Sequence, residues 1–238
     1  MKAIRKAKPA AKGGKPGPRA ARVRSDRAAD TRAKLIDAGL DVFGRLGFEG
    51  ASTREIAKAA GANLAAIVYH FGGKEGLHLA VAEHIAAAIG KRVAPVLMMI
   101  AAPEATASPK AARAALHTVV ETLADVMLGS ADAARWARFI VREQMQPTAA
   151  FDVIYRFLGN AVNNVGRLIG VILSKPPEDE TLRIRVFTVM GQVLIFRVAQ
   201  TLVLRKMEWK TIGDGERALI KRIILEQIDN ILDAEQRP

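Results

Sequence analysis

Helical spacing of apolar residues runs through this chain from about residue 31 onward, and no stretch alternates between apolar and polar side chains as a strand would. In the first such segment the apolar positions fall on one helix face: Ile36, Leu40, Phe43 and Leu46. Half of the residues are hydrophobic but only 5% are aromatic, and Ala, Leu, Ile and Val are common. This mix favours packed helices over a β-sandwich. The sequence therefore predicts an all-α protein with a sizeable core.

Turn-forming residues divide this pattern into separate helices. A long helix is predicted to begin at about Lys74, with Pro95 expected to kink or interrupt it. Further helices are predicted over 109–128, 132–145, 148–174, 180–207 and 216–233. The segment 180–207 is apolar nearly all round, so we expect the core to cover one side and a partner subunit the other. The apolar stripe of 216–233 can share that interface.

Residues 52–71 read as two short helices joined by a tight turn. Ser52 and Glu55 form a capping box that starts the first helix, and Gly61 supplies the turn. Asn63 then caps a second helix that runs to Phe71. This is the plan of a helix-turn-helix, whose second helix enters the major groove of DNA. Spacing alone is only suggestive, because short helix pairs occur in many helical proteins.

A specific set of residues lies in and around this helix pair: Ile36, Ala38, Phe43, Gly47, Phe48, Thr53, Ile56, Ala57, Ala60, Gly61, Ile67, His70, Phe71, Lys74 and Leu77. The set resembles the DNA-binding domain of the TetR family, without a gap from Phe43 to Leu77. The run 62–75 is similar, more narrowly, to the CecR-like subgroup of that family. A weaker similarity extends past residue 90 and includes 142–148.

The resemblance implies a fold and a function. The expected fold is a three-helix DNA-binding domain with a helix-turn-helix, followed by a helical ligand-binding and dimerisation domain. We expect a basic disordered arm over 1–27, a TetR-type DNA-binding domain over 28–88 and an effector-binding and dimerisation domain over 89–238. The expected function is a homodimeric, sequence-specific transcriptional regulator. It would repress at a double-stranded DNA operator and be released by an unidentified small molecule.

Candidate DNA contacts come from helix geometry and from the resemblance. Thr53 and Arg54 lie at the positive end of the first helix of the motif, and Lys74 begins the next helix, so all three are placed for phosphate. The resemblance implies base-facing positions at Leu64, Ala65 and Ala66, with His70 near the DNA backbone. A packed core histidine is the alternative for His70. The candidate set is completed by Asn63, Val68 and Tyr69.

One position departs from the family pattern. Where the family commonly has a phosphate-gripping tyrosine, this chain has Val68, and its tyrosine follows at Tyr69. One residue is a rotation of about 100° on a helix, so Tyr69 cannot simply replace it. Because Leu64, Ala65 and Ala66 also lack hydrogen-bonding side chains, we expect reading by apolar contacts, such as thymine methyls, and by DNA shape.

Positive charge is concentrated at the N-terminus. Nine of the 36 Lys and Arg residues, and none of the 24 acidic residues, lie within 1–25. Such an arm is attracted to any polyanion, and a solubilising tail is the alternative interpretation. The stretch 13–18, rich in Gly and Pro, argues against a helix there. We hypothesise that the arm enters a minor groove next to the operator.

The expected effector site is a mostly apolar pocket with a few polar anchors. The candidates are Arg142, Gln144, Gln192 and Arg197. Arg197 stands among apolar neighbours in the segment 180–207, so we expect it to pair with an acid such as Glu143 or to receive an anionic effector. Pairing within the protein is the favoured alternative.

Other classes of function find little support. The chain has no cysteine, its four histidines have no metal-binding spacing, and it contains no nucleophile elbow, so neither catalysis, a metal nor a cofactor is expected. The most apolar stretch, 186–204, contains Arg197, so no membrane-spanning segment is predicted, and a cytoplasmic protein is expected. A helical protein–protein adaptor with a nonspecific nucleic-acid-binding tail is the alternative function.

Overall fold

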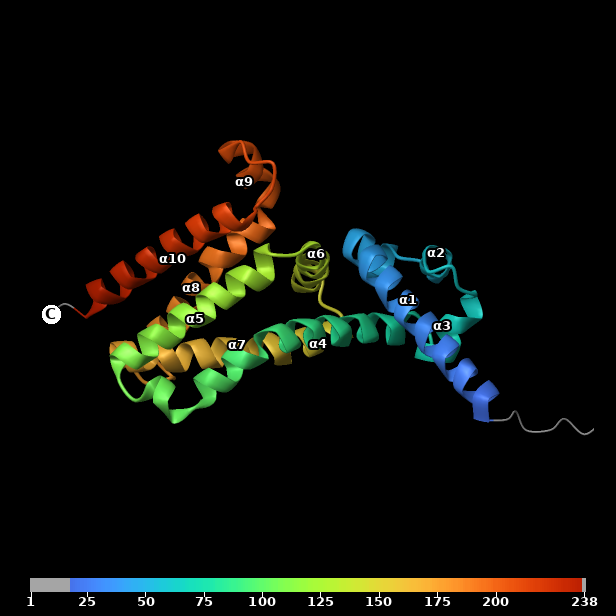
Figure 1. Ribbon diagram of the computed structural model, residues 1–238, viewed down its shortest axis with the longest axis horizontal. Helices are drawn as coiled ribbons and strands as arrows, with labels where there is room; N and C mark the ends of the chain where they lie inside the picture. The colour runs from blue at the N-terminus through green and yellow to red at the C-terminus, as the bar shows by residue number, and fades with distance from the viewer. Residues whose placement is uncertain (1–17, 237–238) are drawn as a thin grey trace, which may run out of the picture.

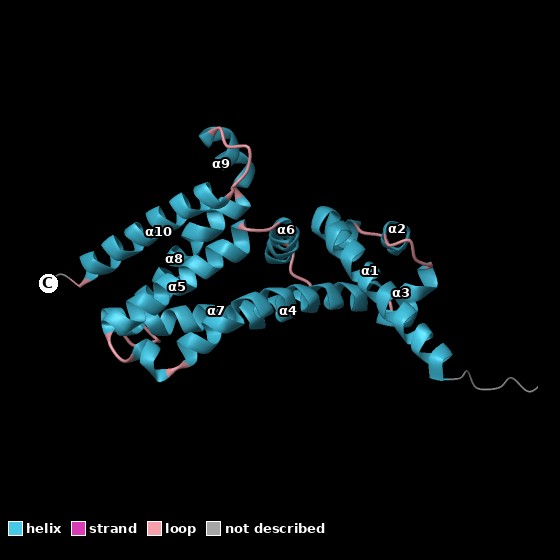
Figure 2. Cartoon of the chain, viewed as in Figure 1, coloured by secondary structure: helices cyan, strands magenta, loops and turns pink. Residues whose placement is uncertain are grey.

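The computed structural model describes residues 18–236, which contain helices and no strands (Figures 1 and 2). The helices, in chain order, are α1 (Pro18–Gly50), α2 (Thr53–Ala59), α3 (Leu64–Phe71), α4 (Lys74–Ala101), the short 3-10 helix η1 (Pro103–Thr106), α5 (Pro109–Leu128), α6 (Ala131–Met145), α7 (Ala149–Leu173), α8 (Glu180–Val198), α9 (Gln200–Met207) and α10 (Asp214–Glu235). The all-α prediction is confirmed.

The molecule is elongated, with two groups of helices (Figure 1). At one end, α1, α2 and α3 pack together, and α1 and α3 contact α4. At the other end, α5, α7, α8 and α10 pack together. Helix α4 runs from the first group into the second, and α6 lies between the groups and packs against α1. Helices α4 and α6 therefore connect the C-terminal helices to α1–α3.

The predicted N-caps Ser52 and Asn63 are confirmed, but the capping box is only half formed, because the Glu55 carboxylate pairs with Arg45 and not with the Ser52 N–H. The Ser52 hydroxyl accepts a hydrogen bond from the Glu55 N–H at 3.1 Å, and the Asn63 side-chain oxygen accepts one from the Ala65 N–H at 2.9 Å. Between the helices, Gly61 has φ +60°, a conformation that glycine adopts without the steric cost other residues meet. These features fix the angle at which α3 leaves α2.

The N-terminal group has a small apolar core. Phe43, Ile56 and Ile67 are almost completely buried, and Ala60 and Phe71 pack at its edge. These residues come from three helices and hold them together by burial of apolar surface. Because Ile67 faces inward, α3 must turn its opposite side away from the core.

The predicted arm over 1–27 needs a correction, because α1 already begins at Pro18. Residues 18–30 are rich in Ala and Arg, which favour helix, and proline is well suited to the first turn of a helix. Residues 1–17, which contain the Gly- and Pro-rich stretch, lie outside the described residues. Near the end of α1, Gly47 leaves helical geometry with φ +74°.

Two further helix predictions are corrected. Helix α4 continues through Pro95 without interruption. Pro95 and Lys91 are both exposed, so water can satisfy the carbonyl that loses its partner. The single helix predicted over 180–207 is two helices, α8 and α9, which meet at Ala199 with a bend of 73°.

By length and composition, α4 alone among the helices described could cross a membrane, and the bent pair α8–α9 would add a second such span. Core helices pass the same test. Both α4 and α8 pack against α5 and α7 in this structure.

Candidate functional site

One side of α3 is open to solvent. Ile67 anchors the helix with 1% exposure, whereas Val68 and Tyr69 are 64% and 80% exposed. Leu64 and Ala65 lie on the same open side. The structure therefore brings together most of the predicted base-facing residues. Ala66 is only partly exposed and packs against the core.

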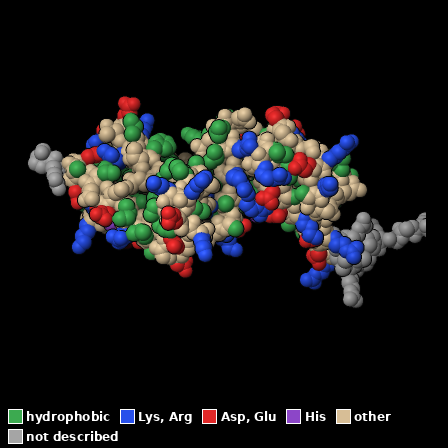
Figure 3. Space-filling model, turned by 90° about the horizontal axis from the view of Figure 1, so that it is seen from above, with side chains coloured by type: hydrophobic (Ala, Val, Ile, Leu, Met, Phe, Trp, Pro, Cys, Tyr) green, Lys and Arg blue, Asp and Glu red, His purple; other side chains and the backbone are tan. Residues whose placement is uncertain are grey.

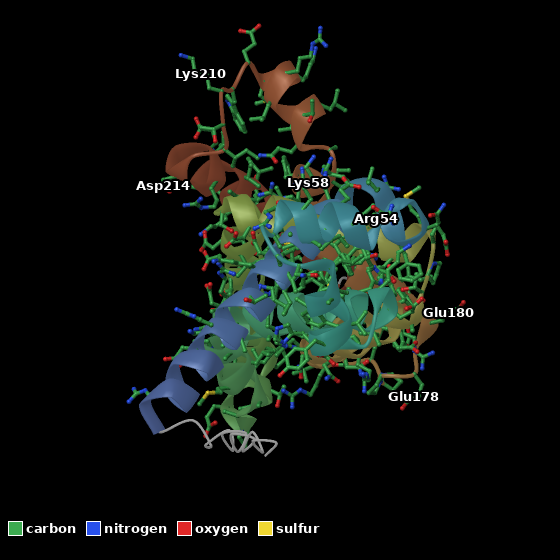
Figure 4. The ribbon with its side chains drawn as sticks, turned by 90° about the vertical axis from the view of Figure 1, so that its right-hand side faces the viewer. Arg54, Lys58, Glu178, Glu180, Lys210 and Asp214 are labelled. Carbon is green, nitrogen blue, oxygen red and sulfur yellow. The ribbon has the colours of Figure 1, made fainter. Side chains whose placement is uncertain are left out.

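A basic pair lies on α2, which packs against α3. Arg54 and Lys58 are both exposed and are separated by one helical turn (Figure 4). Thr53, at the first turn of α2, is half-buried. Sequence reasoning identified Thr53 and Arg54 but missed Lys58, whose signal was its place four residues after Arg54.

Lys74 and His70 are less exposed than the open side of α3. The Lys74 ammonium donates to the Glu49 carbonyl at 3.4 Å and stands 4.4 Å from the centre of the Phe48 ring. The His70 ring is half-buried and meets the Tyr69 ring edge-on at 4.9 Å. Lys74 thus connects the start of α4 to the end of α1.

Arginines of α6 hold the end of α1. Arg135 pairs with Asp41 at 2.7 Å and with Asp37 at 2.8 Å. Burial alone would lower the pKa of Arg135, but its hydrogen bonds to the two carboxylates and their charge raise that pKa above its usual value. About two turns further along α6, Arg142 donates to the carbonyls of Gly44 at 3.3 Å and Arg45 at 2.5 Å.

A buried histidine joins α4 to α6. His78 Nε2 lies 3.4 Å from Glu143 Oε1, and the Thr148 hydroxyl and N–H both donate to Glu143 Oε2. The ring is surrounded by those of Phe43, Phe48 and Phe139. Burial, helped by the charge of Lys74, lowers the pKa of His78 to about 4. The imidazole is therefore neutral at pH 7, so its contact with Glu143 is not an ion pair.

An apolar cavity of about 170 Å³ lies among α4, α5, α6, α7 and α8. Its few polar residues are Thr122, Gln144, Asn164 and Arg197. Two of the predicted anchors, Gln144 and Arg197, therefore line it. Gln192 does not, and its side-chain oxygen is buried without a hydrogen-bond partner among the described residues.

The favoured interpretation of Arg197 was wrong. Glu143 contacts His78 and accepts hydrogen bonds from Thr148. Arg197 donates instead to the Met127 carbonyl at 2.6 Å and to the Gln200 side-chain oxygen at 2.7 Å. Within residues 18–236 no carboxylate lies within ion-pair distance of Arg197, although it is only 7% exposed. Burial accordingly lowers the pKa of Arg197 from its usual value.

A separate apolar surface covers the outer side of α8 and α9. Phe187 is 64% exposed and Leu202 69% exposed, and Ile184, Ile195 and Val198 belong to the same surface. Leu219 and Ile223 of α10 are also partly exposed. Seen from above, hydrophobic side chains gather over this C-terminal half of the molecule (Figure 3).

Two family models match the chain. The model described as "Bacterial regulatory proteins, tetR family" matches residues 35–81, and the model "HTH-type transcriptional dual regulator CecR, C-terminal domain" matches residues 112–235. A relative from Shigella flexneri, the HTH-type transcriptional dual regulator CecR, is 33% identical over 205 residues, which cover 84% of this chain and 91% of the relative.

Solved structures share the fold. The transcriptional regulator FadR from Bacillus subtilis, in complex with stearoyl-CoA, aligns with a TM-score of 0.57 at 17% identity, over 82% of this chain and 96% of that chain. AibR, in complex with isovaleryl coenzyme A and operator DNA, aligns with a TM-score of 0.59 at 14% identity, over 83% and 97% of the two chains.

Proposed function

The chain belongs to the TetR family of transcriptional regulators, with a C-terminal domain of the CecR type, and on this premise we propose that it is a homodimeric cytoplasmic repressor released from its operator by a small molecule. In this proposal residues 28–88 bind DNA, and residues 89–238 bind the effector and dimerise. The protein acts by binding alone, with no catalytic step and no cofactor.

The single observation that carries the DNA-binding role is the open side of α3 beside the basic pair of α2. Leu64, Ala65 and Val68 would meet base edges, where apolar side chains contact thymine methyls. Arg54, Lys58 and the N–H groups at the start of α2 would meet phosphates. The remaining candidates for DNA contact are Thr53, Asn63, Ala66, Tyr69, His70 and Lys74.

The apolar surface of α8 and α9 supports the dimer. Exposed apolar side chains such as those of Phe187 and Leu202 are of the kind that marks protein–protein interfaces. A twofold pair would place two copies of α3 on one face of a DNA duplex, with half-sites about one helical turn apart. We expect Phe187→Glu to yield monomers in sedimentation experiments and to weaken operator binding. A variant that stays dimeric would exclude this surface.

Three features support release by a ligand. The cavity lies among the C-terminal helices, α6 connects those helices to α1, and two solved structures with this fold contain coenzyme A thioesters. A ligand that shifts α6 would change the position of α1 and therefore of α3. Rotation of a rigid DNA-binding unit is sufficient to separate both half-sites.

Selection of DNA from a pool of random duplexes tests the proposal. We expect the full chain to enrich a palindromic sequence whose half-sites are separated by about one helical turn. Enrichment of no sequence, together with equal affinity for all duplexes, would contradict a sequence-specific regulator. It would favour a protein that binds nucleic acid only through charge.

A further inference from the structure

An open groove adjoins the apolar cavity. The groove has a volume of about 670 Å³ and lies between the end of α1, one side of α6 and the junction of α8 with α9. Arg45, Arg138, Arg142 and Arg197 line this groove, and no acidic side chain of the described residues does. We call it the arginine groove. Seen from above, Lys and Arg side chains gather between the two groups of helices (Figure 3).

The cavity and the arginine groove share a wall. Ala137, Val141, Arg197 and Val198 line both spaces. Arg197 therefore stands at the boundary between an apolar chamber and a basic one. Its guanidinium is bonded to the Met127 carbonyl and the Gln200 amide, which are both neutral. A buried charge compensated only by neutral groups is costly, and an anion at this boundary would supply the missing charge.

Two other arginines of the groove are able to bind an anion. Arg138 is exposed and forms no hydrogen bond or ion pair within residues 18–236. Among the described residues Arg142 donates only to the neutral carbonyls of Gly44 and Arg45, which a stronger acceptor can displace. The planar, forked guanidinium matches carboxylate and phosphate groups better than any other side chain does.

We propose that the effector is an amphipathic anion: its apolar part enters the cavity, and its carboxylate or phosphate head lies in the arginine groove. This inference rests on the proposed function as a ligand-released repressor. The cavity, at about 170 Å³, is slightly larger than a cavity of about 150 Å³ that accommodates benzene, so the apolar part has about six carbon atoms. A neutral ligand of that size would leave the charge of Arg197 without a partner.

The same arrangement connects the ligand to DNA. Arg142 holds the last turns of α1, directly before the break in that helix at Gly47. An anionic head that draws Arg142 toward itself removes two hydrogen bonds between α6 and α1. The DNA-binding helices then lose part of their attachment to the effector-binding helices. Arg142 is thus the residue through which occupancy of the groove changes the position of α3.

Calorimetry with matched probes tests the inference on the full chain. Hexyl phosphate carries the tail and the head, hexanol carries the tail alone, and inorganic phosphate carries the head alone. We expect hexyl phosphate to bind at least about tenfold more tightly than either of the others. Arg138→Ala and Arg142→Gln should weaken the binding of hexyl phosphate by about three- to tenfold and leave the affinity for hexanol unchanged. Arg222→Ala, an exposed arginine on α10, is the matched control and should bind like the wild type.

Two more probes distinguish the sources of the head. Tighter binding of hexanoyl-coenzyme A than of hexanoate supports a thioester of a phosphorylated carrier, and equal binding supports a free carboxylic acid. Hexanol binding as tightly as hexyl phosphate, or affinities unchanged in the Arg138 and Arg142 variants, would overturn the inference. Operator binding by the ligand-free protein is measured in the same buffer. If it persists, only the nature of the effector is wrong; if it is absent, the proposed function itself fails.

Discussion

Arg135 and Arg197 each bond to residues of another helix, but Arg135 meets carboxylates and Arg197 meets neutral groups. At the junction of α1 and α6, Arg135 is held by Asp37 and Asp41. At the boundary of the cavity, Arg197 meets only neutral oxygens within residues 18–236. The first region satisfies its charges internally and is built for stability. The second region leaves the positive charge of Arg197 for an anionic ligand. Arg54 and Lys58 on α2 are likewise left for DNA phosphates.

Protonation of His78 should produce the largest change in stability, because it puts a charge into a region whose polar groups are already satisfied. The pKa of His78 in the folded protein is about 4, below its ordinary value of 6.5, so the unfolded chain binds more protons between these pH values. The stability contribution of neutral His78 is therefore complete above pH 6.5 and is lost as the pH falls toward 4. We expect a loss of about 2–3 kcal/mol.

Urea unfolding at several pH values measures this loss. His78→Gln keeps a polar side chain beside Glu143 but does not titrate, so its stability should change less between pH 6.5 and 4 than that of the wild type. Parallel pH profiles for the two proteins would show that His78 does not carry the effect.

Removing the exposed charges of α2 should affect DNA affinity and not stability. The double variant Arg54→Ala with Lys58→Ala loses two cations per subunit, and we expect operator affinity to fall about hundredfold at about 0.1 M salt. The slope of log K against log salt should become shallower at the same time. Fluorescence anisotropy measures both quantities, and Arg222→Ala provides the control. A double variant with wild-type affinity and slope would place the phosphate contacts elsewhere.

Removing Arg135 should reduce stability by a smaller amount. Arg135→Ala leaves Asp37 and Asp41 without their partner, but the Asp37 carboxylate is exposed and that of Asp41 about half exposed, so water can reach both. We expect a loss of about 1–2 kcal/mol in the free energy of unfolding. Thermal unfolding of Arg135→Ala beside Arg138→Ala measures the contrast, because Arg138 should be neutral for stability. Equal effects of the two variants would end the distinction between the regions.

Removing Arg197 should have the smallest effect on stability. Arg197→Met takes away a buried charge and fills the same space with an apolar side chain, so the free energy of unfolding should stay the same or rise by up to about 1 kcal/mol. Binding of hexyl phosphate should nevertheless fall. A large loss of stability would show that the bonds to Met127 and Gln200 satisfy Arg197 fully. The contrast with Arg135 would then disappear.

Local signals were sufficient to predict most of the fold. The N-caps at Ser52 and Asn63 and the turn at Gly61 depend on residues within a few positions, and the structure has them as expected. The bend at Ala199 has no such signal, because no Gly or Pro stands there. It depends on how α8 and α9 pack in the folded chain.

The candidate site was predictable where it lies on one helix and not where it joins several. The open side of α3 follows from helical periodicity around Ile67. The partners of Arg197, in contrast, come from α5 and α9, and the arginine groove combines residues about a hundred positions apart. Sequence spacing cannot show which distant acid pairs with which arginine. The pairing of Glu143 with His78 rather than Arg197 is the clearest example.

Release of the operator by matched probes shows whether an amphipathic anion is the effector. The wild-type dimer, bound to its selected operator, is titrated with hexyl phosphate and separately with hexanol. We expect hexyl phosphate to dissociate the complex at concentrations at least about tenfold below those of hexanol, and Arg142→Gln to reduce this difference by about three- to tenfold. Dissociation by both probes at the same concentration, in wild type and variant alike, would contradict this expectation.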